Sequence, residues 1–208
     1  MGVLPLICVL IAAAALALGE GEREMVRDLT ALDLAGRERA YADVVQQRDR
    51  TVADLLLTAD LDAEAARRKG ASLQEYSALV DGKNLAMDAL GAYRASEAVD
   101  CLLRQLTYQT PRSISVDGYK EYERNFPAAA ALSEIGMPAV GPALEKLADA
   151  PGPVEWRLCA WIVKDVLGSD LALAALRMHA DTEADPTRKA RLEAGIEFIA
   201  KPDWHTLQ

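Results

Sequence analysis

The stretch that decides the fold is residues 128–147, AAAALSEIGMPAVGPALEKL. It begins with an Ala/Leu segment up to Ile135, turns at Gly136, and continues into a second segment with Ala139-Val140 and leucines four and seven residues after Val140. Apolar residues three and four apart are typical of a helix with one buried face. Glycine just after an apolar helix adopts a left-handed backbone without a Cβ clash. The stretch therefore predicts a helical hairpin.

The same unit occurs on both sides of this stretch. Upstream, DALG at 88–91 precedes AVDCLLRQL at 98–106. Downstream, a predicted helix at 156–167 precedes the turn GSD and a second predicted helix at 171–179. Residues 188–199 predict the first helix of a fourth copy, or a terminal cap. The turn glycines are 32 residues apart from Gly136 to Gly168, a helical-hairpin period, but 45 apart from Gly91 to Gly136.

Residues 76–200 resemble HEAT repeats in their short bacterial form. The resemblance depends on the Ala-Leu-x-x-Ile-Gly and Ala-Val-x-x-x-Leu-x-x-Leu signatures within 128–147, with Arg157 near the start of the next helix. Asp100 and Gly141 depart from it, because the family often has proline there. The resemblance implies an all-α fold, a right-handed α-α superhelix of stacked hairpins, whose second helices line a concave protein-binding face. It implies no chemistry of its own.

The N-terminal segment from Val3 to Leu18 has no charged residue. Its length of about 16 residues is short of the roughly 20 that span a bilayer, and it suits the apolar region of a secretory signal. We expect a signal peptide at 1–19, cleaved after Gly19 or, as the second choice, after Ala17. The chain would then be exported to the periplasm, the cell envelope or the outside. An uncleaved membrane anchor and a buried N-terminal helix are the alternatives.

Residues 20–70 form a predicted N-terminal helical region ahead of the predicted repeats at 71–202. No proline occurs between 20 and 110, and Ala, Leu, Glu and Arg, which favour helices, are abundant. Apolar residues three or four apart predict a long helix from about 22 to 57, with Gly36 and Thr51 as possible breaks. A coiled-coil partner is one interpretation, but no heptad is sustained, so we expect the helix to pack on the rest of the chain.

The composition offers little material for chemistry. The formal net charge is −9, which argues against nucleic acid as a partner, and the chain has 2 His and 3 Cys. His179 and His205 have no second ligand nearby in the sequence, so we expect no metal, no cofactor and no enzymatic activity. After cleavage of a signal, Cys101 and Cys159 would remain. An entire hairpin should separate them, so we expect both to stay reduced.

The insertion at 109–126, QTPRSISVDGYKEYERNF, interrupts the repeat rhythm and is our first candidate for specificity. Its aromatic residues are concentrated in a chain that is only 5% aromatic, and tyrosine is favoured at contact surfaces. An equally good interpretation is that these rings anchor the loop to the repeats. The predicted partner-binding residues are Tyr108, Tyr119, Tyr122, Phe126, Arg104 and Glu145.

The sequence thus predicts an exported, non-enzymatic module that binds or scaffolds an unknown protein partner. It would bind through the concave face, the 109–126 insertion, or both. One alternative is an enzyme, because HEAT-like repeats also resemble those of phycobilin lyases and some DNA glycosylases. Another is a structural envelope protein that contacts the membrane through an uncleaved N-terminus.

Overall fold

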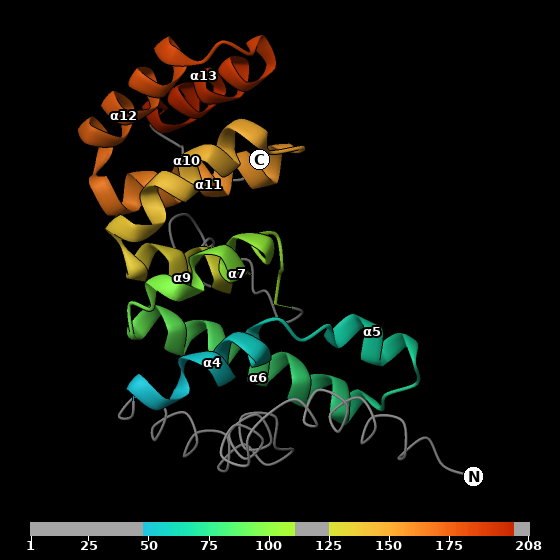
Figure 1. Cartoon of the computed structure of the whole chain (residues 1–208). Helices are drawn as coiled ribbons and strands as arrows, with labels where there is room; N and C mark the ends of the chain where they lie inside the picture. The colour runs from blue at the N-terminus through green and yellow to red at the C-terminus, as the bar shows by residue number, and fades with distance from the viewer. Residues whose placement is uncertain (1–47, 111–124, 202–208) are drawn as a thin grey trace. The chain divides into compact units, whose positions relative to one another are not determined.

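The computed structural model describes residues 48–110 and 125–201 (Figure 1). Within these ranges every regular element is a helix and no strand occurs, so the predicted all-α class is confirmed. The described helices, in chain order, are α4 (Arg48–Ala59), α5 (Ala63–Arg68), α6 (Leu73–Ala92), the 3₁₀ turn η1 (Ser96–Ala98), α7 (Val99–Arg104), α9 (Pro127–Ile135), α10 (Met137–Asp149), α11 (Pro153–Leu167), α12 (Ser169–Thr182) and α13 (Pro186–Ala200).

The chain divides into two compact units, with the boundary between Tyr93 and Arg94. The sequence predicted a boundary at 70/71, but α6 belongs to the first unit, where it packs against α4 and α5. Of the predicted long helix at 22–57, only the end lies in the described residues, as α4. The predicted signal peptide at 1–19 lies outside them.

The first unit is held together by the apolar face of α6. Ser72 caps this helix: its Oγ accepts a hydrogen bond from the Glu75 backbone N–H at 3.2 Å, and the Glu75 carboxylate accepts from the Ser72 N–H at 2.8 Å. Leu90 of α6 and Leu55 of α4 are fully buried. Lys83, only 4% exposed, donates from Nζ to the Leu61 carbonyl at 2.9 Å.

The helices of the second unit begin where the sequence supplies a suitable first turn. Pro127, Pro138, Pro153 and Pro186 each lie within the first two residues of a helix, where the missing N–H costs no intrahelical hydrogen bond. Asp185 caps α13 by accepting from the N–H groups of Thr187 and Arg188. Each predicted helix of this unit is therefore present, and the helices with proline in the first turn begin one to three residues before the predicted start.

The helices of the second unit pack as paired layers. The most extensive pairings are α10 with α11 and α12 with α13, each joined by a short loop. Three pairs of helices one repeat apart also pack together, namely α7 with α10, α9 with α11, and α11 with α13. The fourth such pair, α10 and α12, does not, because α10 packs on α13 instead. The helices joined by a single glycine, α9 with α10 and α11 with α12, pack less extensively than α10 with α11 and α12 with α13. Figure 1 shows α12 and α13 at one end of this unit, followed by α10 with α11 and then by α7 with α9.

The core of the second unit combines alanines with a few large side chains. Trp161 of α11 is 1% exposed, and Trp156 packs edge-on against Phe198 with ring centroids 5.7 Å apart, so both indoles serve packing. Gly195 lies at a close approach of α13 to α10. A Cβ added there would meet Leu147 Cδ1 at 3.2 Å.

No helix in the described ranges is long and apolar enough to cross a membrane.

Candidate partner-binding face

Two neighbouring helices of the second unit, α7 and α10, have exposed residues four apart along one side. On α7 these residues are Asp100 and Arg104, and on α10 they recur every four residues. We call this surface the α7–α10 face; it consists of Asp100, Arg104, Met137, Gly141, Glu145 and Asp149.

The exposure of α10 follows directly from its amphipathic pattern. Ala139, Ala143 and Leu147 point into the core and are buried, while Met137, at the first turn, is 66% exposed. Gly141 lies in mid-helix before Pro142, a position where a Cβ would crowd the proline ring. The face therefore has no side chain at Gly141, in the middle of α10.

Arg188 of α13 binds the acidic edge of this face. Its Nη2 donates to Glu145 Oε2 at 2.8 Å, its Nη1 pairs with Asp149, and its Nε donates to Glu183 Oε2 at 2.7 Å. These pairings raise the pKa of Arg188, with the bond to Glu183 as the largest cause. The same bond holds the pKa of the Glu183 carboxyl below its ordinary value. One guanidinium thus connects α10 to α13.

Two further contacts connect α10 to its neighbours α13 and α11. Arg191 donates from Nη1 to the Ala148 carbonyl at the end of α10, at 2.9 Å. Lys146 pairs with Glu155 of α11 at 2.7 Å, and Glu155 is only 13% exposed. α10 is therefore linked by side chains to both α11 and α13.

The insertion starts and ends at one point of the fold. The Thr110 N–H donates to the Asn125 carbonyl at 3.2 Å, which brings the two ends of the segment together. Asn125 is 6% exposed, and the next residue, Phe126, is fully buried. Tyr108 lies half-buried just before this junction. Tyr119 and Tyr122 lie outside the described residues.

The predicted partner-binding residues therefore do not form one site. Arg104 and Glu145 lie on the α7–α10 face, and Glu145 is also bound by Arg188. Tyr108 lies at the base of the insertion. Phe126 needs a correction: its ring is buried in the core at the start of α9, so it anchors the insertion and is not exposed to a partner.

Sequence reasoning missed Asp149 and Arg188. The spacing of Glu145 and Asp149, four residues apart on one helix, places them on the same face and could have indicated that they act together. Arg188 lies 43 residues after Glu145, and no local pattern connects them.

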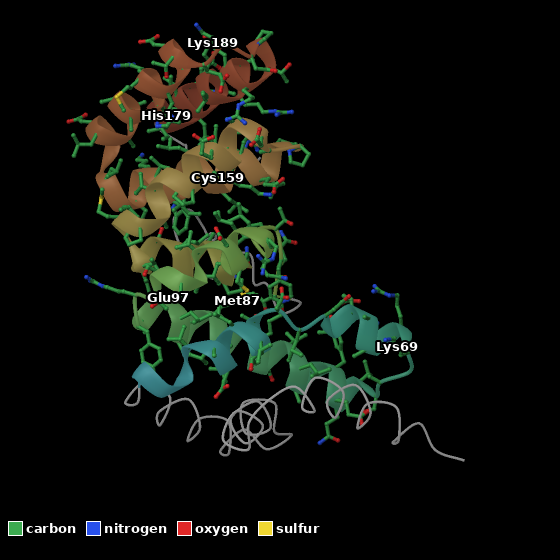
Figure 2. The ribbon with its side chains drawn as sticks, viewed as in Figure 1. Lys69, Met87, Glu97, Cys159, His179 and Lys189 are labelled. Atoms are coloured by element: carbon green, nitrogen blue, oxygen red, sulfur yellow. The ribbon has the colours of Figure 1, made fainter. Side chains whose placement is uncertain are left out.

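The described residues contain no group of three or more His, Cys, Asp or Glu side chains placed to hold a metal ion. His179 lies half-buried on α12 (Figure 2). His205 is outside the described residues. Cys101 and Cys159 are both buried and are not joined to each other, and burial raises the pKa of the Cys159 thiol.

Comparisons with protein-family models, with curated proteins and with solved structures give no match.

Proposed function

We propose that the second unit is a short HEAT-like α-solenoid that binds or scaffolds another protein through the α7–α10 face, with the 109–126 insertion adding specificity. In this proposal the unit is the right-handed superhelix that the repeat signatures imply. The chain acts without enzymatic activity in the cell envelope or the secreted space.

The observation that supports the proposal best is the packing of helices one repeat apart. α7 lies against α10 and α9 lies against α11, which is how stacked hairpins bury faces that no single hairpin can bury alone. Such stacking leaves one row of helices exposed to solvent as an extended surface, and in this chain α7 and α10 form that row.

The chemistry of the face suits a protein partner. It has one cation at Arg104, an exposed apolar residue at Met137 and a carboxylate pair held by Arg188. Arginine and methionine are enriched at protein interfaces, and paired carboxylates retain acceptor sites for a donor on a partner. The face carries carboxylates beside its one arginine, so it does not suit binding to the phosphate backbone of a nucleic acid.

A capture experiment tests the face. The affinity-tagged full chain would be isolated from the cells that produce it, and co-purifying proteins would be quantified by mass spectrometry. We expect at least one protein that the unmodified chain retains to be lost with the double variant Arg104→Glu/Met137→Glu. The matched control, Arg68→Glu/Leu73→Glu, likewise changes one exposed arginine and one exposed apolar residue, but on the first unit, and should retain it.

A second variant separates the insertion from the face. Because the Thr110 N–H binds the Asn125 carbonyl, residues 111–124 can be replaced by a short Gly-Gly-Ser-Gly linker without moving α7 or α9. Loss of the captured protein with unchanged helicity by circular dichroism would assign specificity to the insertion. An identical set of proteins for all four chains would reject the proposed function.

The proposed export has its own test. Signal peptidase accepts small residues before the cleaved bond, and the segment before Glu20 provides them. We expect N-terminal sequencing of the mature protein to begin at Glu20, or at Leu18 if cleavage follows Ala17. A chain that begins at Met1 and is found in the cytosol would contradict export.

A further inference from the structure

The methionines of the described ranges lie in different surroundings. Met87 of α6 is fully buried, whereas Met137 of α10 is 66% exposed and Met178 of α12 is 61% exposed. Oxidation of a thioether requires contact between its sulfur and the oxidant. Burial therefore protects Met87, and the sulfurs of Met137 and Met178 are open to a hydroperoxide.

Of these two exposed methionines, Met137 is the one that belongs to the α7–α10 face. The residue one turn later on the same side of α10 is Gly141. A side chain at that position would lean toward the N-terminus of the helix and over Met137, but glycine has none. No atom of another element lies within 4 Å of a Cβ added at Gly141, so no neighbouring helix fills this space. The thioether of Met137 is therefore uncovered along α10.

We propose that Met137 is a modification site, at which oxidation to methionine sulfoxide weakens binding by the α7–α10 face. This inference rests on the proposed function of that face. The oxidant is hydrogen peroxide. The sulfur donates an electron pair to one peroxide oxygen, the O–O bond breaks, and that oxygen stays on the sulfur while the other leaves as water. The sulfur is oxidised by two electrons and the peroxide is reduced by two.

This oxidation changes the surface of α10 and not its packing. An exposed apolar side chain becomes polar, and a polar group that is buried against an apolar partner surface loses its hydration. The added oxygen lies at the start of α10, where Gly136 provides no side-chain cap. The N-terminus of a helix carries partial positive charge and favours an electronegative group. The oxidised chain therefore keeps its fold and binds its partner less tightly.

Peptide mass spectrometry of the full chain after graded treatment with hydrogen peroxide tests the site itself. We expect sulfoxide to form at Met137 and at Met178 at least about tenfold faster than at Met87, because burial excludes the oxidant. The Tm of the treated chain, measured by circular dichroism, should stay the same. A rate at Met137 as slow as that at Met87, or a fall in Tm that follows oxidation of Met137, would overturn the inference whether or not any protein binds the face.

Partition of a partly oxidised sample tests the effect on binding. The tagged full chain, treated until about half of Met137 is sulfoxide, is mixed with the protein captured by the α7–α10 face, and bound and free chains are separated. We expect Met137 sulfoxide to be depleted about tenfold among the bound chains, since burial of a methionine side chain is worth roughly that factor in affinity. Met178 sulfoxide, the internal control, should be equal in both pools.

Reversal completes the test. Methionine sulfoxide reductase should return the free chains to the bound pool, because it converts the sulfoxide back to the thioether. Equal Met137 sulfoxide in the two pools, or no recovery of binding after the reductase has repaired Met137, would overturn the inference. Retention of every captured protein by the Arg104→Glu/Met137→Glu variant would instead reject the proposed function of the face.

Discussion

Gly136 and Gly168 end their helices in a backbone conformation that other residues rarely adopt. Gly136 has φ 82° and ψ −136°, and Gly168 has φ 77° and ψ 165°. At each position a single residue connects two helices, so the whole change of direction depends on it. The sequence predicted both of these turns correctly. The third predicted turn glycine, Gly91, lies inside α6 instead, with no left-handed backbone.

Replacing either turn glycine with alanine should destabilise the second unit. We expect Gly136→Ala to lower the free energy of unfolding by about 1–3 kcal/mol, because a Cβ strains this backbone region. Urea unfolding followed by circular dichroism measures the loss.

The control for this prediction is Gly152→Ser, at the N-cap of α11. Gly152 has φ −142°, an extended backbone that any residue adopts, and no atom lies within 4 Å of an added Cβ. Serine is a good N-cap, so stability should stay the same or rise slightly. Equal effects of the two substitutions would contradict the assigned turn geometry.

At the residue scale the sequence was less informative about contacts than about turns. Phe126 was predicted as a partner contact, with anchoring as the alternative, and its burial agrees with the alternative. An aromatic residue beside a polar insertion has the same local pattern in either role. The clustering of Glu145, Asp149 and Glu183 around Arg188 is a tertiary feature, and local sequence does not encode it.

At the scale of elements, helix positions were predictable and helix pairing was not. The apolar periodicity predicted helices at 156–167, 171–179 and 188–199, and α11, α12 and α13 include all three. The sequence paired helices across the glycine turns, yet α10 packs most extensively on α11 and α12 on α13. A one-residue turn leaves little chain to bring two helices side by side, whereas the loops at 150–152 and 183–185 allow it.

The contact between α10 and α13 should depend on Arg188. We expect Arg188→Met to lower the Tm at neutral pH, because Glu145, Asp149 and Glu183 lose their shared cation. Lys189→Met is the matched control, since the neighbouring Lys189, labelled in Figure 2, forms no ion pair among the described residues. Differential scanning calorimetry compares the two.

The pH dependence of this effect has a definite sign. Glu183 has its pKa held below the ordinary value of 4.5, mainly by the side chain of Arg188, so it binds fewer protons in the folded state than in the unfolded state. Its contribution is complete above about pH 4.5 and is lost as the pH falls through the lowered pKa. The Tm difference between Arg188→Met and the unmodified chain should therefore shrink at acid pH. A constant difference down to about pH 2 would contradict the assigned pairing.

At the scale of the whole molecule, the sequence predicted a helical N-terminal region followed by repeats but misplaced the boundary between them. The helix at 73–92 has the Ala/Leu composition and the terminal glycine of the repeat signature, so it was assigned to the repeats. Its apolar residues instead pack against α4 and α5 in the first unit. Composition does not distinguish a helix of the first unit from a helix of the repeats, because the helix buries its apolar face in either unit.

The central claim, that the α7–α10 face binds a protein, is tested most directly by hydrogen–deuterium exchange of the full chain with and without its captured partner. We expect slower exchange on binding at the residues of α7 and α10, 99–104 and 137–149, and no change in α12. Protection confined to the first unit, or no protection in α7 and α10, would contradict the claim.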